Sequence, residues 1–275
     1  MLTSLPLDDP ACDTRAVPPA PSDAFGPHEG LFETMRADGG RIPWIERHLD
    51  RLEASAATLG LTGIASRDEI RAAALGAVTT VGRGPLRVRA TATRDGAVAV
   101  DVEPIGAMPQ PTAVTLRGAW DPSAALREHK TTRYSELRRA AVQARARGAG
   151  HALLLDRAGD LGEAATASVI LRIGGRDRTP PIRGILPGVA RARVLERLPV
   201  EVSPISEQEW RDASEIVLVN ALRRTMPVLS VDGRDVGARR AGPLAAKLAA
   251  LLDGERVGED DARCERAAGA PDDRG

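Results

Sequence analysis

The stretch Leu126-Arg-Glu-His-Lys130-Thr-Thr-Arg-Tyr134-Ser-Glu-Leu137 holds one of only two lysines in the chain. The chain has 38 Lys and Arg residues in total, and the remaining 36 are arginines. A desolvated lysine can lose its proton and form a Schiff base, whereas arginine stays charged. The second lysine, Lys247, lies in an Ala- and Leu-rich segment whose pattern is typical of a helix with a solvated face. Lys130 is therefore the candidate for chemistry, and the plainer alternative is an exposed surface lysine.

Composition excludes several classes of protein. A chain of 275 residues can form one large domain or two smaller ones. The net charge of zero and the aromatic content of 2% argue against a nucleic-acid partner. Cys12 and Cys264 lie in segments that look unstructured, so we expect no disulfide and no metal site. The N-terminus does not read as a signal peptide and no apolar run matches a membrane span, so we expect a cytoplasmic protein without a membrane partner.

The order of helical and strand patterns predicts an α+β chain with two domains. Apolar residues recur at helical spacing from Ile45 to Leu59, and the turn at Arg94-Asp95-Gly96 joins two alternating stretches into a hairpin. Three prolines between Glu103 and Pro111 favour a linker. The expected divisions are a flexible N-terminal arm at 1–22, a small α+β domain at 23–105, a linker at 106–111, a large domain at 112–252 and a disordered tail at 253–275.

The second half of the chain alternates strands and helices. We expect helices over 134–147, 189–198 and 243–252, and strands over 151–156, 167–173 and 215–219. Ser66 with Glu69, and Ser206 with Glu209, have the spacing of capping boxes at the start of helices.

Two features could bind an anion. Arg51 shares the apolar face of its helix, so its guanidinium needs an anionic partner, either a structural carboxylate or a bound phosphate. Gly188 precedes a helix whose first amides, those of Val189 and Ala190, would point outward. Many helices begin with Pro-Gly, so an ordinary helix start is the alternative for this second feature.

Other polar residues have a structural and a functional interpretation. Glu163 is followed by small residues that leave room for a ligand, although an exposed hairpin glutamate is the alternative. Asn220 ends a predicted strand, where ligand contacts are common, and could instead stabilise a turn. Arg89 and Arg94 flank the hairpin and could meet a carboxylate or be solvated.

Six stretches of the chain, in order from about Glu29 to Gly233, together resemble one family. They are Glu29-Gly-Leu-Phe-Glu-Thr-Met-Arg36, His48-Leu-Asp-Arg-Leu52, Lys130-Thr-Thr, Leu153-Leu-Leu-Asp-Arg-Ala-Gly-Asp-Leu-Gly-Glu163, Thr179-Pro-Pro-Ile-Arg-Gly-Ile-Leu-Pro-Gly188 and Asn220-Ala-Leu-Arg-Arg-Thr-Met-Pro-Val228. They resemble the fold-type IV enzymes that use pyridoxal 5'-phosphate, the class-IV aminotransferase family. The resemblance implies a small α/β N-terminal domain and a larger, β-rich pseudo-barrel domain, with the cofactor between them. It also implies a homodimer.

The resemblance assigns roles to individual residues. Lys130 is expected to hold the cofactor as a Schiff base and to shuttle the α-proton, and Glu163 to face the pyridine nitrogen and keep it protonated. The other cofactor contacts that it implies are Arg51, Tyr134, Val189, Ala190 and Ala221. The substrate contacts that it implies are Thr34, Arg94 and Asn220.

The chain departs from the family pattern around the expected phosphate. Ala190 and Ala221 stand where family members carry threonines. Ser168 replaces the usual asparagine, and Ile170 the usual aromatic residue. Backbone amides can still bind phosphate at this place.

The segment Asn220-Ala-Leu, followed by Met226-Pro-Val, most resembles the aminodeoxychorismate lyases of the family. These enzymes release pyruvate from 4-amino-4-deoxychorismate and leave 4-aminobenzoate for folate synthesis. One alternative is a branched-chain or D-amino-acid aminotransferase that uses 2-oxoglutarate. A second is a non-catalytic relative that keeps the fold for binding.

Overall fold

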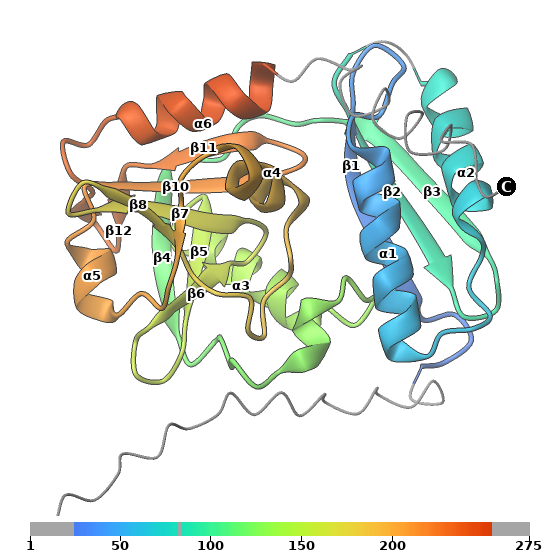
Figure 1. The fold of residues 1–275 in the computed structure, drawn as a ribbon, viewed down its shortest axis with the longest axis horizontal. Helices are drawn as coiled ribbons and strands as arrows, with labels where there is room; N and C mark the ends of the chain where they lie inside the picture. The colour runs from blue at the N-terminus through green and yellow to red at the C-terminus, as the bar shows by residue number, and fades with distance from the viewer. Residues whose placement is uncertain (1–24, 82–83, 255–275) are drawn as a thin grey trace, which may run out of the picture.

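The computed structural model describes residues 25–81 and 84–254, which form a small unit and a large unit side by side (Figure 1). The expected arm at 1–22 lies outside the described residues, as does all of the expected tail beyond Gly254. The chain passes between the units through residues 105–111, where the prolines predicted a linker and no helix or strand forms.

The small unit is a three-stranded antiparallel sheet covered on one face by two helices. Its strands follow the order β1 (Gly30–Ala37), β2 (Leu86–Thr93), β3 (Val98–Pro104). The helices are α1 (Ile45–Leu59) and α2 (Arg67–Thr79), and they bury a shared apolar core against the sheet. Because β2 occupies the centre, β1 is an edge strand that can accept a further segment of chain.

The ends of both helices follow from local sequence. Gly60 ends α1 with a positive φ of 66°, a conformation that glycine adopts without steric cost. Ser66 and Glu69 form the predicted capping box at the start of α2.

The large unit contains two five-stranded sheets with an apolar core between them. The first sheet has the order β13 (Arg234–Asp235), β12 (Ser230–Val231), β4 (Thr112–Arg117), β5 (His151–Leu155), β6 (Leu161–Ala164). The second has the order β11 (Arg224–Val228), β10 (Glu215–Asn220), β7 (Ser168–Ile173), β8 (Arg176–Thr179), β9 (Glu201–Val202).

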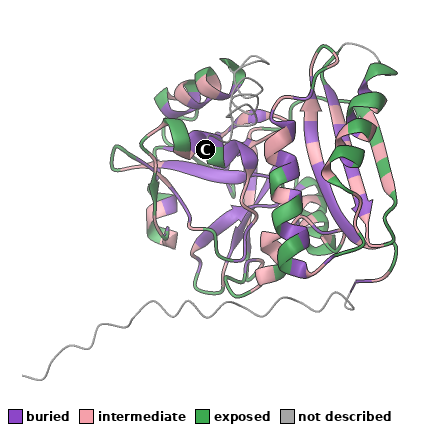
Figure 2. Ribbon diagram, turned by 45° about the vertical axis from the view of Figure 1, so that its right-hand side comes forward, coloured by how far each residue is buried: buried purple, intermediate pink, exposed green. Residues whose placement is uncertain are grey.

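Helices cover the outer faces of these sheets. The helix α3 (Ser135–Ala146) packs on β4 and β5, while α4 (Val189–Arg197) and α6 (Pro243–Gly254) pack on β10. The short helix α5 (Glu207–Arg211) begins with the capping box predicted at Ser206 and Glu209. A 3-10 turn, η2 (Ala125–Glu128), precedes Lys130. Figure 2 shows the central strands of the large unit as almost continuously buried, with exposed residues on the outer sides of the helices.

Several strands of the large unit were not predicted, among them β6 and β8. Both β6 and β8 have four residues and lie next to glycine-rich turns, so their patterns are too short to separate from turn sequence. Glu163 consequently lies on a buried strand, and the exposed hairpin alternative for this residue is wrong.

Two glycine substitutions test the packing of the small unit. A Cβ on Gly30 would lie 2.1 Å from the carbonyl oxygen of Ala92 on β2, whereas a Cβ on Gly76 within α2 would meet nothing within 4 Å. We expect Gly30→Ala to lower the free energy of unfolding by about 1–3 kcal/mol. The control Gly76→Ala should raise it by about 0.5–1 kcal/mol, because alanine is the better helix former. Urea unfolding followed by circular dichroism measures both, and equal effects would contradict the β1–β2 packing.

Candidate active site

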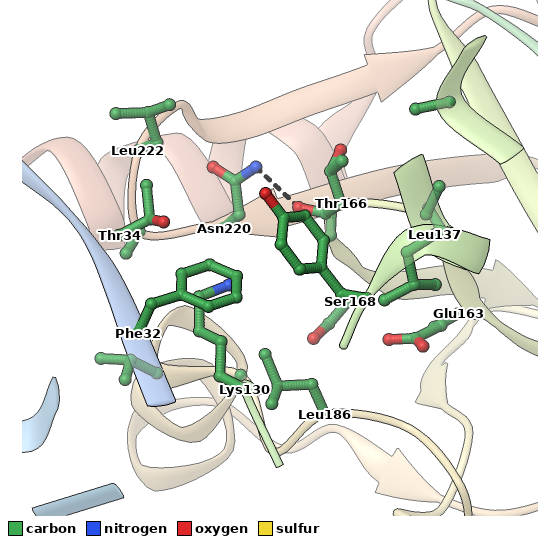
Figure 3. Close-up of a pocket in the computed structure, with 18 of the residues that line it drawn as sticks. Phe32, Thr34, Lys130, Leu137, Glu163, Thr166, Ser168, Leu186, Asn220 and Leu222 are labelled. Carbon is green, nitrogen blue, oxygen red and sulfur yellow. Dashed lines mark hydrogen bonds between the residues drawn. The ribbon is translucent and has the colours of Figure 1, made fainter. Parts of the chain in front are cut away.

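A cavity of about 430 Å³ lies where β1 and α1 of the small unit face the large unit. The loop around Lys130, the strand β6, the start of α4 and the turn after β10 complete its wall. Figure 3 shows Phe32, Thr34 and Lys130 on one side of this space and Glu163 and Ser168 on the other.

Lys130 is held by strand pairing between the two units. The segment that follows η2 adds to the exposed edge of β1. The amide of Phe32 donates to the carbonyl of Lys130 at 2.9 Å, and Thr131 forms an antiparallel bridge with Leu31. These backbone contacts fix the start of the lysine side chain, whose Nζ lies 4.6 Å from the centre of the Phe32 ring.

The environment of Lys130 favours the neutral amine. Burial lowers the pKa of Lys130 from 10.5 to about 8, and the positive charge of Arg51 acts in the same direction, while Glu33 partly opposes it. At pH 7 about a tenth of an amine with this pKa is neutral, far more than of an ordinary lysine, and the neutral form is the one that a nucleophile or a general base requires.

Glu163 supplies the carboxylate of the cavity. Burial raises the pKa of Glu163 to about 7, and the charge of Arg127 and a hydrogen bond with the backbone of Leu186 partly offset this effect. Arg127 Nη2 lies 3.4 Å from Glu163 Oε1. A carboxyl group whose pKa stays near 7 beside Arg127 needs a further cationic partner to be fully ionised at neutral pH in so buried a place.

Glu33 on β1 joins two side chains of α1. Its carboxylate accepts hydrogen bonds from Nε and Nη2 of Arg51 at 2.8 and 2.5 Å, and lies 2.7 Å from Nδ1 of His48. A third donor of Arg51, Nη1, binds the carbonyl of Pro187 at 2.9 Å. A guanidinium has five N–H groups, so Arg51 keeps donors for an anion while it makes the structural ion pair. Both interpretations of Arg51 are therefore compatible with one geometry.

The start of α4 borders the same cavity. Gly188 is the residue before the helix, and a Cβ added there would lie 2.6 Å from Ser168 Oγ. Val189 and Ala190 form the first turn, where backbone N–H groups have no partner within the helix.

The turn after β10 forms another part of the rim. Asn220 donates from its side-chain amide to the carbonyl of Thr166 at 3.0 Å (Figure 3). It also accepts from the amide of Arg223 at 2.7 Å. These two bonds fix the turn and bring Ala221 and Leu222 to the cavity wall.

An aromatic and cationic group lies beside Lys130. The Tyr134 hydroxyl accepts a hydrogen bond from Nη1 of Arg89 at 2.8 Å, and the rings of Tyr134 and Phe32 are 4.8 Å apart. The Arg89 guanidinium carbon lies 3.7 Å from the centre of the Phe32 ring. Thr34, which pairs with Arg89 across β1 and β2, also lines the cavity.

Arg94 lies outside this site, although we expected it to bind substrate. Its Nη1 donates to the carbonyl of Phe25 at 2.8 Å, and it is not among the residues that line the cavity. Arg94 follows the last residue of β2, so the alternation that places Arg89 on the cavity face does not extend to it. That alternation could have pointed to Arg89 instead of Arg94, the residue that the resemblance implied.

The sequence did not reveal Glu33 and Arg127 as parts of the site. Glu33 lies between Leu31 and Met35 on the side of β1 that packs on α1, a position that usually carries an apolar residue. Its partners were only 15 and 18 residues away on the predicted helix face, so a search for a carboxylate opposite His48 and Arg51 could have found it.

Other kinds of site find no support in the part of the chain that the structure describes. Within residues 25–81 and 84–254 no group of His, Cys, Asp and Glu side chains could hold a metal ion. None of the helices formed by these residues is long and apolar enough to cross a membrane.

Comparison with known families agrees with this geometry, because the model of the family called amino-transferase class IV matches residues 30–231. The chain belongs to the class-IV aminotransferase family. This family has the fold-type IV architecture, and its members are pyridoxal-phosphate-dependent enzymes.

Two curated relatives carry names of branched-chain aminotransferases. A putative branched-chain-amino-acid aminotransferase of Methanocaldococcus jannaschii is 25% identical over 243 residues, which cover 80% of this chain and 84% of that protein. The branched-chain-amino-acid aminotransferase-like protein 2 of Arabidopsis thaliana is 25% identical over 248 residues. These cover 80% of this chain and 44% of that protein, so the chain spans less than half of its length.

Solved structures share the fold. A putative 4-amino-4-deoxychorismate lyase of Legionella pneumophila has a TM-score of 0.71 at 24% identity, with 83% of this chain and 92% of that chain covered. A fold IV transaminase of Curtobacterium pusillum has a TM-score of 0.68 at 27% identity, covering 86% and 85%. A hypothetical aminotransferase of Mycobacterium tuberculosis in its PLP-bound form has a TM-score of 0.71 at 23% identity, covering 83% and 89%.

The depressed pKa of Lys130 predicts when its amine reacts. The rate of condensation with added pyridoxal phosphate should rise with pH and level off above about 8, because the neutral amine is the nucleophile. For a lysine with an ordinary pKa, the rate of condensation would still be rising at pH 10. Stopped-flow absorbance between pH 6 and 10 measures this profile, with Lys130→Arg as the control that should not react. A midpoint near 10 would contradict the buried environment.

Proposed function

We propose that this protein uses pyridoxal phosphate to eliminate pyruvate from 4-amino-4-deoxychorismate, leaving 4-aminobenzoate. The observation that carries the proposal is the pairing of Lys130 and Glu163 in one cavity, the first with a pKa of about 8 and the second with a pKa of about 7. Both side chains come from the large unit, and β1 of the small unit closes the space above them.

The residues present fit the cofactor. Its phosphate would be held by the spare donors of Arg51 and by the amides of Val189 and Ala190 at the start of α4, with Ala221 beside them. Glu163 would pair with the protonated pyridine nitrogen, which supplies the cationic partner that its raised pKa calls for.

Tyr134 is assigned a supporting role next to the lysine. Its hydroxyl accepts from Arg89, so its own proton is free to be donated to an oxygen of the cofactor or the substrate. Thr34 and Asn220 are assigned to the substrate side, where Thr34 lines the cavity directly and Asn220 holds the turn that carries Leu222.

Bound pyridoxal phosphate supplies an electron sink for the carbanion that forms when a C–H bond breaks. Lys130 is assigned the removal of the proton from the ring carbon that bears the amino group. Loss of the enolpyruvyl group then aromatises the ring. The expelled group takes up one proton as it becomes pyruvate, and this balances the proton that Lys130 removed. The elimination needs no water and no second substrate, so the cavity has only to position one molecule and to move protons.

Two features support the lyase. The turn Asn220-Ala-Leu222 and the following Met226-Pro-Val228 have the lyase-like sequence, and the first of these forms the cavity rim. The cavity is also lined by Arg89, Arg138 and Arg145, which suit a substrate with two carboxylates.

The second candidate is transamination of a branched-chain or D-amino acid with 2-oxoglutarate. Its support is the naming of the two curated relatives as branched-chain aminotransferases or aminotransferase-like proteins. The cofactor residues serve both reactions, because both begin with the same proton removal.

The two reactions differ in their need for an acceptor. We expect the protein loaded with pyridoxal phosphate to release pyruvate from 4-amino-4-deoxychorismate in the absence of 2-oxoglutarate. Lys130→Ala should lose at least 1,000-fold in rate, on the order of what removal of a catalytic nucleophile or base costs. Coupled lactate dehydrogenase assays measure pyruvate directly. Formation of a keto acid only when 2-oxoglutarate is added would favour the aminotransferase, and no turnover in either assay would favour a non-catalytic relative.

We further propose that residues 23–105 and 112–252 act as two domains and that the protein is a homodimer. The apolar side chains of Met108 and Val142 are 60% and 55% exposed, which suits surfaces that a second copy covers. Analytical ultracentrifugation would show twice the chain mass of 29.0 kDa.

A further inference from the structure

The strongest unexplained feature of the cavity is the outer nitrogen of His48. Its Nε2 is buried and has no hydrogen-bond partner, although His48 is one of the residues that line the cavity. Only three buried side-chain atoms within residues 25–81 and 84–254 lack a partner in this way. A buried polar atom without a partner is costly, so such an atom at a binding site indicates a ligand.

Glu33 decides which nitrogen of His48 carries the proton. The side chains of Glu33 and His48 are each 1% exposed, and Nδ1 lies 2.7 Å from the Glu33 carboxylate. The ion pair with Arg51 keeps the pKa of Glu33 at about 2, so the carboxylate is ionised and can only accept. Nδ1 must therefore donate to Glu33, and Nε2 of the neutral ring presents a lone pair.

The surroundings of His48 identify the ligand as an anion. Arg51 is bound to the same carboxylate and reaches the carbonyl of Pro187, the residue before Gly188 at the start of α4. The amides of Val189 and Ala190 border the same cavity as His48. This grouping of a guanidinium, a helix start and an imidazole is the chemistry of a phosphate site.

The side chains at this place leave room for an additional phosphate contact. Ala190 and Ala221 carry methyl groups, so neither can donate a hydroxyl. His48 is the unpartnered polar side chain that could take up that role.

We infer that His48, positioned by Glu33, binds the phosphate of the cofactor and that this contact takes up one proton. The inference rests on the proposed use of pyridoxal phosphate and adds a phosphate ligand to it. A lone pair cannot bind a phosphate dianion, so either the ring gains a proton and donates it, or the phosphate keeps one and donates it to Nε2. Both arrangements hold one proton more than the neutral ring and the free dianion.

The proton uptake makes phosphate binding depend on pH. In the free protein burial lowers the pKa of His48 below its usual 6.5, and Arg51 and Lys130 act in the same direction, against the charge of Glu33. A phosphate monoester loses its second proton near pH 6. Above about pH 6.5 the free partners are therefore both deprotonated, and affinity should fall as pH rises, by up to tenfold per unit.

Pyridoxamine phosphate isolates this contact, because it has no aldehyde to condense with Lys130. Calorimetric titration at pH 6.5, 7.5 and 8.5, in buffers with different ionisation enthalpies, measures both affinity and protons taken up. Pyridoxamine, which lacks the phosphate, is the ligand control, and His28→Gln is the protein control because His28 is exposed and does not line the cavity.

Two substitutions of His48 separate its two nitrogens. His48→Asn keeps an amide near Nδ1 to bind Glu33 and removes the nitrogen at the Nε2 position. It should bind pyridoxamine phosphate roughly tenfold more weakly at pH 6.5 and take up about one proton fewer than the wild type, which leaves only the pH dependence contributed by Lys130 and Glu163. His48→Gln places an amide donor near Nε2, so it should recover part of the affinity, while its proton uptake and pH dependence match those of His48→Asn.

The outcomes distinguish this inference from the proposed function. If the wild type binds pyridoxamine phosphate, and His48→Asn matches it in affinity and proton uptake, then the role of His48 is wrong and the cofactor assignment stands. If the wild type does not prefer pyridoxamine phosphate to pyridoxamine, the cofactor assignment itself fails. Circular dichroism melting of each variant shows whether a loss of affinity reflects loss of the fold.

Discussion

The buried carboxylate of Glu33 is the contact on which the site depends. It is surrounded by the apolar core of the small unit, and its charge is tolerated because Arg51 and His48 both bind it. Removal of one partner from such a buried group typically costs about 3–5 kcal/mol, because the remaining charge has no compensation. The carboxylate thus ties β1 to α1, and Arg51 extends the link to Pro187 in the large unit.

A second constraint places the lysine. The segment after η2 pairs with the edge of β1, so the backbone of Lys130 belongs to the small sheet although its chain continues into α3. The cavity is consequently built across the junction of the two units. Burial at this junction lowers the pKa of Lys130 and raises the pKa of Glu163, so the same enclosure makes the amine and the carboxyl group able to exchange protons near neutral pH.

Much of the fold could be predicted from periodicity and local signals. The helices α1, α3, α4 and α6 lie within one or two residues of their expected ranges, because apolar spacing and the terminal Gly or Pro residues are local properties. The four-residue strands β6 and β8 could not be predicted, since their extended form depends on pairing with β5 and β7. The approach of Lys130 to β1 is likewise non-local, because it joins segments about 100 residues apart.

Most residues that the resemblance assigned to the candidate site lie in one cavity. The resemblance was less useful where the position of a residue along its strand decides which face its side chain occupies. Arg51, Thr34, Lys130, Tyr134, Glu163, Val189, Ala190, Asn220 and Ala221 all line one cavity. Arg94 does not line the cavity. It follows the last residue of β2, so the alternation of side chains along the strand does not place it on the cavity face. Glu33 was hidden by its position in an apolar run, and only the opposing pair on α1 explains why a carboxylate is stable there.

The central claim is that Lys130 forms the covalent bond to pyridoxal phosphate. Because Lys130 and Lys247 are the only lysines of the chain, borohydride reduction of the loaded protein followed by peptide mass spectrometry can assign the attachment without ambiguity. We predict a phosphopyridoxyl group on Lys130 at close to one per chain, with Lys247 unmodified. A label on Lys247, or on neither lysine, would contradict the account.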